Sequence, residues 1–149
     1  MPLLTLGQNV TSYGIWLDYL SYANTVGVAE NGRYVYTAGE KGIFILDKEE
    51  ESITKKSKLN GLSDINVTAI EYAKKAGVLV IGYSNGNIDL LSEGGNVTNL
   101  SDIKRSTKNA GLKNINSIYV VDEFAYVCLD FGIVKIDLKR LIVLETWLV

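Results

Sequence analysis

Residues 40–47 read EKGIFILD, residues 84–91 read SNGNIDLL, and residues 130–137 read DFGIVKID. Each stretch carries a glycine at its third position, followed by residues in which an apolar position alternates with a variable one. This period of two is typical of a β-strand with one buried face. The glycines stand at positions 42, 86 and 132, at spacings of 44 and 46 residues, so the chain contains an internal repeat.

Positions on both sides of these glycines also match. The residues six before are Tyr36, Val80 and Tyr126, and those eleven after are Ile53, Val97 and Val143. Each unit contains four short apolar runs separated by turn residues, and four strands at a period near 45 are typical of β-propeller blades. We therefore predict an all-β fold with three four-stranded antiparallel blades, at about residues 26–57, 66–101 and 115–148.

The N-terminal part gives two further predictions. Residues 15–21 are expected to form one extra outer strand, so that residues 15–149 make up an incomplete propeller. Residues 1–14 are interpreted either as the remnant of a signal peptide or as a disordered end. The open flanks of a three-blade array predict either a truncated product of a larger protein or the association of two copies into a six-blade ring.

Composition excludes several kinds of chemistry. The 149 residues are 47% hydrophobic and 21% charged, as in folded globular domains. The absence of histidine excludes Ser-His-Asp and Cys-His catalytic pairs, and the single cysteine excludes a disulfide within the chain. A net charge of −2 argues against nucleic-acid binding, and no run approaches the ~18 apolar residues of a membrane span. We predict no cofactor and no metal site.

The segments around the second unit resemble a known propeller repeat. Residues 58–70 read KLNGLSDINVTAI and residues 77–86 read GVLVIGYSNG, similar to the repeat of two-component-regulator-type propellers. In that family the blades form the extracytoplasmic sensor of hybrid histidine kinases. Residues 16–22, WLDYLSY, more closely resemble the start of the mature chain of PorZ-like proteins of the bacterial type IX secretion system. That resemblance, over residues 16–149, implies two seven-bladed propellers and a small C-terminal β-domain, of which three blades are present here.

The longest linker between blades, residues 101–114, is rich in basic side chains. It has one acidic residue, Asp102, against four basic ones. This pattern predicts either a solvated loop or a contact site for an anionic glycan, a lipopolysaccharide or an acidic partner surface. The residues that would make these contacts are Lys104, Arg105, Lys108 and Lys113.

Cys128 has a structural interpretation. It occupies the same repeat position as Ala38 and Gly82, four residues before each repeat glycine. A position that holds only small residues predicts a close approach of neighbouring sheets, so we expect a packing role for Cys128 and not a reactive thiol.

Three polar residues interrupt the otherwise apolar strands that follow the repeat glycines: Asn87, Asp89 and Lys135. We predict that they make hydrogen bonds or an ion pair between the second and third blades, or that they line the central channel.

These observations predict a non-enzymatic scaffold. The resemblance implies an extracytoplasmic protein at the outer membrane that contacts other secretion-system proteins or a surface glycan. The alternative is a polysaccharide-sensing propeller of a hybrid two-component regulator. Glycan hydrolysis by paired carboxylates is a third interpretation, but no such pair recurs at the strand ends.

Overall fold

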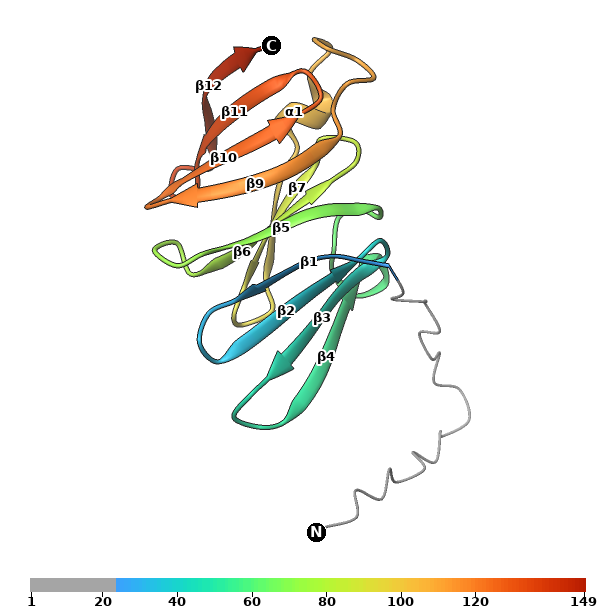
Figure 1. The fold of residues 1–149 in the computed structure, drawn as a ribbon, viewed down its shortest axis with the longest axis vertical. Helices are drawn as coiled ribbons and strands as arrows, with labels where there is room; N and C mark the ends of the chain where they lie inside the picture. The colour runs from blue at the N-terminus through green and yellow to red at the C-terminus, as the bar shows by residue number, and fades with distance from the viewer. Residues whose placement is uncertain (1–23) are drawn as a thin grey trace.

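A computed structural model describes residues 24–149, which form three separate four-stranded antiparallel sheets (Figure 1). The first sheet contains β1 (Thr25–Glu30), β2 (Tyr34–Gly39), β3 (Gly42–Asp47) and β4 (Ser52–Ser57). The second contains β5 (Val67–Ala73), β6 (Val78–Tyr83), β7 (Ile88–Ser92) and β8 (Val97–Leu100). The third contains β9 (Ile115–Val121), β10 (Phe124–Leu129), β11 (Gly132–Asp137) and β12 (Ile142–Leu148). The predicted all-β fold of propeller blades is confirmed, while the extra strand predicted at residues 15–21 lies outside the described residues.

Within each sheet the strands lie in chain order, so each strand pairs with the next one of the same sheet through a turn. The turns of the first and third sheets repeat in atomic detail. Oδ1 of Asp47 accepts hydrogen bonds from the N–H groups of Glu49 and Glu50, at 2.9 and 3.2 Å. Oδ1 of Asp137 accepts the same bonds from the residues two and three positions later, both at 2.9 Å. The repeat therefore extends to the aspartate that caps the β3–β4 turn in the first sheet and the β11–β12 turn in the third.

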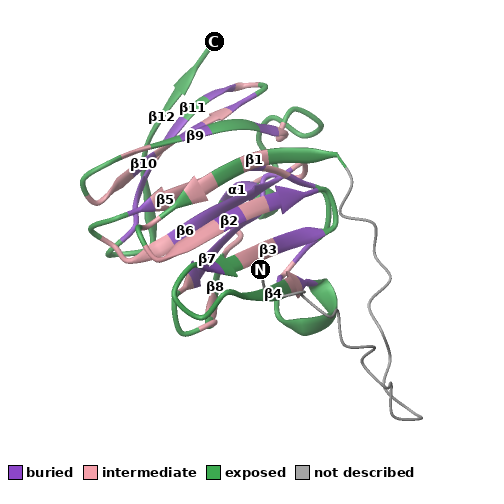
Figure 2. Ribbon diagram, turned by 60° about the horizontal axis from the view of Figure 1, so that its bottom comes forward, coloured by how far each residue is buried: buried purple, intermediate pink, exposed green. Residues whose placement is uncertain are grey.

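The sheets stack through their first strands, with β1, β5 and β9 side by side (Figure 1). An apolar core lies between each pair of neighbouring sheets, because each strand directs alternate side chains to opposite faces of its sheet. The core between the first and second sheets includes Tyr36, Ile43, Ile70, Leu79 and Tyr83. The core between the second and third sheets includes Val80, Ile88, Ile115, Val127 and Val134. Figure 2 shows this burial along β6 and β10, whereas β12 is exposed along its whole length.

The small-residue position confirms the expected close approach of the sheets. A methyl group added at Gly82 would lie 2.7 Å from Cγ2 of Ile115 on the third sheet, well inside van der Waals contact. Ala38, at the same position of the first sheet, is fully buried. Cys128 is half-buried and alternates with side chains that face the second sheet, so it lies on the opposite face of β10.

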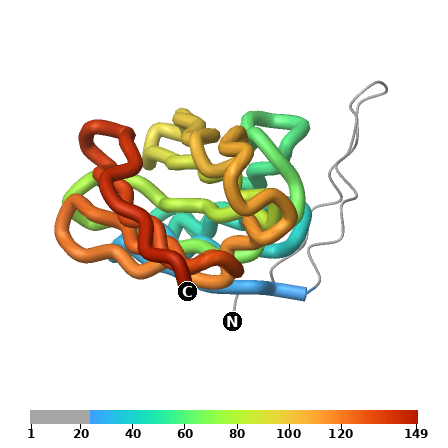
Figure 3. Tube along the Cα trace, turned by 90° about the horizontal axis from the view of Figure 1, so that it is seen from above, coloured from blue at the N-terminus to red at the C-terminus, as the bar shows by residue number. Residues whose placement is uncertain are grey.

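The linkers between sheets contain short helical segments. The 3-10 turn η1 (Lys58–Asn60) follows β4 and is capped by Ser57, whose Oγ accepts from the N–H of Leu59 at 3.3 Å. The single-turn helix α1 (Asp102–Arg105) follows β8. Seen from above, the linker that contains α1 lies beside β12 (Figure 3). Within residues 24–149 we find no helix of the length and hydrophobicity needed to cross a bilayer.

Candidate functional site

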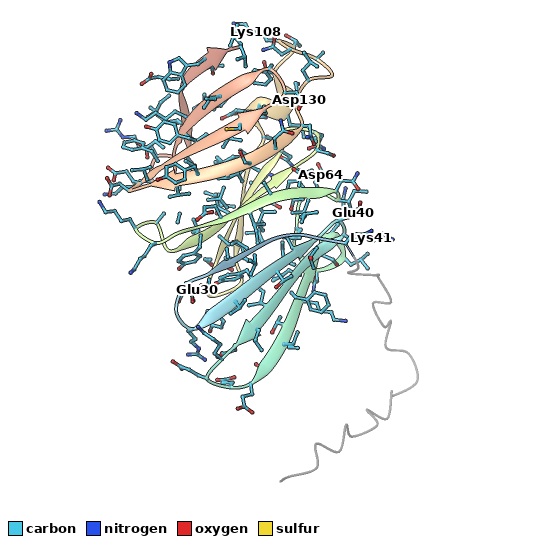
Figure 4. The ribbon with its side chains drawn as sticks, viewed as in Figure 1. Glu30, Glu40, Lys41, Asp64, Lys108 and Asp130 are labelled. Atoms are coloured by element: carbon cyan, nitrogen blue, oxygen red, sulfur yellow. The ribbon has the colours of Figure 1, made fainter. Side chains whose placement is uncertain are left out.

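The basic linker is anchored by an ion pair. Nζ of Lys104, on α1, donates to Oδ2 of Asp64 at 2.6 Å. Asp64 lies in the preceding linker, between β4 and β5, and its side chain is only 10% exposed. Figure 4 shows Asp64 at the edge of the second sheet. Because the lysine belongs to a helical turn 40 residues later in the chain, this contact joins the two linkers.

Several donors hold the carboxylate of Asp64. Nδ2 of Asn85 donates to Oδ2 at 2.7 Å, and Nδ2 of Asn87 donates to the same oxygen at 3.3 Å. The N–H of Ile65 donates to Oδ1 at 3.1 Å. Burial alone would raise the pKa of Asp64, but the hydrogen bonds from Lys104 and Asn85 outweigh burial and lower this pKa to about 2.

The same network continues into the second sheet. Nδ2 of Asn99 donates to Oδ1 of Asn87 at 3.0 Å and to Oδ1 of Asp89 at 2.8 Å. Oδ2 of Asp89, a fully buried residue, accepts from the N–H of Ser63 at 2.7 Å and from the hydroxyl of Tyr83 at 2.6 Å. Burial and the neighbouring Asp89 carboxylate raise the pKa of Tyr83, so the phenol remains a donor.

We call this set the Asp64–Asp89 network; its side chains are Asp64, Tyr83, Asn85, Asn87, Asp89, Asn99 and Lys104. It contains two carboxylates and one ammonium group, and its donors come from both linkers and from the second sheet. Among the described residues, every buried side-chain polar atom has a hydrogen-bond partner. A buried network with all its groups satisfied fixes the positions of its members, so this one holds the linkers in place.

The interpretation of the polar strand residues is corrected in one respect. Asn87 and Asp89 do make hydrogen bonds, but their partners lie in the second sheet and in the linker between the first and second sheets, and not in the third sheet. Lys135 takes no part in the network. Its Nζ lies 4.6 Å from the ring centre of Phe124 and 3.9 Å from Oε1 of Glu145, both in the third sheet.

The other basic residues of the linker differ in their surroundings. Arg105 pairs with Asp102 on the surface, at 3.4 Å. Nζ of Lys113 donates to the carbonyl oxygens of Lys104, at 2.8 Å, and Ser106, so it stabilises the linker backbone. The side chain of Lys108 has no ion-pair or hydrogen-bond partner within residues 24–149, and Figure 4 shows it near the C-terminal end of β12.

A groove of about 660 Å³ separates this linker from the third sheet. Its apolar lining consists of Ile103, Phe131, Val134, Val143 and Leu148. Polar residues also line it, among them Lys108 and Thr146. The groove thus combines an apolar lining with a cation that has no partner among the described residues.

The sequence did not indicate which residues join the network. Asp64 lies in the linker that resembles the propeller repeat and Asn99 lies in the second unit, but nothing in the sequence indicated that they belong to one network. The only local signal was the interruption of an apolar strand by Asn87 and Asp89. Nor does the described part of the chain contain a group of three or more histidine, cysteine, aspartate or glutamate side chains placed to hold a metal ion.

The three stacked four-stranded sheets place this chain in the β-propeller class. A family model for the N-terminal β-propeller domain of PorZ, a type IX secretion system protein, matches residues 35–149. The chain therefore belongs to the family of PorZ N-terminal β-propeller domains. No curated protein sequence matches it.

Among solved structures, the chain is similar to PorZ of Porphyromonas gingivalis, described as an essential bacterial surface component of the type IX secretion system. The identity is 30%, the TM-score is 0.76, and the match covers 86% of this chain and 17% of PorZ. The chain thus spans about a sixth of the length of that relative.

More distant structures share the fold alone. The match to hydrazine synthase of Kuenenia stuttgartiensis has 10% identity and a TM-score of 0.67, and covers 93% of this chain and 39% of that protein. The computationally designed protein Ika4 matches at 13% identity with a TM-score of 0.65, over 87% of this chain and 75% of the design.

Proposed function

We propose that this chain is a non-enzymatic scaffold of a type IX secretion system, located outside the cytoplasm at the outer membrane. The observation that carries the proposal is the match to the PorZ N-terminal propeller over residues 35–149. Its partners would be other secretion-system proteins or a surface glycan of the lipopolysaccharide type.

The contacts of the conspicuous polar groups support a scaffold role. Asp64 and Asp89, the buried carboxylates of the network, are saturated with hydrogen bonds from the fold itself. A general acid or base needs access to its substrate, and these groups face other protein groups. Arg105 is exposed on the surface and Lys108 is exposed in the groove, and both remain the candidates for contact with an anionic glycan or an acidic protein surface.

Cell fractionation of the native host tests the proposed location. An epitope-tagged protein, expressed from its own locus, should be recovered with the periplasmic or outer-membrane fraction, alongside a marker of each. Recovery with a cytoplasmic marker would refute the proposal. A gene that continues into a transmembrane helix and a kinase domain would instead favour the polysaccharide sensor.

A further inference from the structure

The outermost strand of each sheet has a free edge, and the three edges differ in their protection. β4, β8 and β12 each end their sheet and pair on one side only among the described strands. An unpaired edge presents backbone N–H and C=O groups to any extended segment, and proteins usually protect such edges with lysines or by keeping the strand short. The first two edges have this protection, because β4 contains two lysines and β8 has only four residues.

Comparison of equivalent repeat positions shows that β12 lacks the two lysines of β4. In the first sheet, Lys55 pairs with the residue two positions after the repeat glycine, and Lys56 with the residue one position after it. In the third sheet, those two ladder positions are occupied by Thr146 and Trp147. β12 has seven residues, all of them exposed, and its sequence IVLETWL contains a single charge, Glu145. The edge of β12 is therefore long, apolar and without a lysine, and Figure 2 shows that the strand is exposed.

The groove lies directly against this strand. Val143, Thr146 and Leu148 line it from β12, while Lys108 lines it from the linker that contains α1. A peptide that extends the sheet directs every second side chain to the same face. Apolar side chains on that face would enter the groove, and an acidic side chain would meet the ammonium group of Lys108.

We propose that the edge of β12 binds an extended peptide segment of a partner protein by β-strand addition, with alternate apolar side chains in the groove and an acidic residue at Lys108. The charge of Lys108 favours an acidic partner. A second copy of this chain that paired through its own β12 would be less favourable. Its only charge is Glu145, so the two glutamates would lie on neighbouring edges and repel each other. This inference deepens the proposed scaffold role, and rests on it only for the choice of a protein as the partner.

The test uses three labelled peptides and measures fluorescence anisotropy with the full chain. The first alternates valine and threonine over nine residues and has a glutamate at each end. The second has lysines at its ends, and the third is the first with every valine and threonine backbone nitrogen methylated. We expect the acidic peptide to bind about five-fold more tightly than the basic one, as for an exposed ion pair. The methylated peptide should not bind, because it lacks the backbone donors.

Matched variants locate the site. T146K introduces at the edge of β12 a lysine like the one that β4 has at the same ladder position, and it should abolish binding. T54K adds the same charge to the exposed part of β4 and should leave binding unchanged. K108E should reverse the preference, so that the lysine-ended peptide binds more tightly.

Four results would overturn the inference: no binding of the acidic peptide, equal binding of the methylated peptide, unchanged binding by T146K, or a dimer that T146K dissociates. The comparison of methylated and unmethylated peptides needs no variant, so it holds even where a substitution impairs folding. Peptide binding in solution and location in the cell are separate measurements. Failure of this inference is therefore distinguishable from failure of the proposed function.

Discussion

The ion pair between Lys104 and Asp64 gives a quantitative prediction for the substitution K104M, which keeps the aliphatic part of the side chain. The lowering of the Asp64 pKa from 3.8 to about 2 corresponds to roughly 2 kcal/mol in favour of the folded carboxylate. Several donors share this stabilisation, and the Lys104 side chain is 41% exposed, so we assign about 1 kcal/mol to the lysine. For a chain of this size the melting temperature at pH 7 should fall by about 2–4 °C.

The stabilisation by this ion pair should depend on pH. The folded-state pKa of Asp64 lies below its unfolded value, so its contribution is complete above the unfolded pKa of about 4 and is lost as the pH falls towards 2. Without Lys104, the pKa of Asp64 in the folded protein should rise towards its value in the unfolded protein. The difference in free energy of unfolding between wild type and K104M should therefore shrink as the pH falls from 5 to 2. Urea denaturation followed by circular dichroism at each pH measures it.

Two controls separate the ion pair from general effects. R105M removes a neighbouring charge that pairs only at the surface, and should cost less than about 0.5 kcal/mol. In a D64N background, K104M should have a much smaller effect, because the carboxylate is absent. A K104M protein as stable as wild type at pH 7, or an equal loss in the D64N background, would show that the ion pair with Asp64 does not stabilise the fold.

Three further predictions concern packing and the network. Gly82→Ala should destabilise the fold by about 1–3 kcal/mol in urea denaturation, because the methyl group meets Cγ2 of Ile115, and in an Ile115→Ala background, which lacks that carbon, the same substitution should cost less. Tyr83→Phe should cost about 1–3 kcal/mol, because it removes a 2.6 Å hydrogen bond to buried Asp89; an unchanged denaturation midpoint would contradict this. Gly132→Ala should speed hydrogen exchange in β11 and β12, because φ is +148° and the facing backbone leaves no room for a Cβ.

The architecture could be predicted from the sequence because its determinants are local and repeated. Each repeat glycine is followed by a strand whose apolar positions alternate, and the same columns recur at nearly constant spacing. The small residues Ala38, Gly82 and Cys128 fill one column, and this was enough to expect the close approach of sheets that Ile115 makes at Gly82. Because the same pattern occurs three times, it predicts the blade architecture more strongly than a single strand pattern would.

The network could not be predicted, because its partners are distant in the chain and occur only once. Asp64 and Lys104 are 40 residues apart, and the pairing of two linkers depends on how the sheets stack. The sequence indicated Lys104, Arg105, Lys108 and Lys113 as one basic group that could bind an anion. The structure gives them separate surroundings, with Lys104 on a carboxylate and Lys113 on backbone carbonyls. Their contact with an anionic partner remains a prediction.

We propose that this propeller serves type IX secretion as a scaffold. The most direct measurement is an in-frame deletion of the gene in the native host, followed by quantification of type IX cargo proteins in the culture medium. We expect that cargo is lost from the medium and that the wild-type gene restores it. Unchanged cargo secretion in the deletion strain would contradict a role of this protein in type IX secretion.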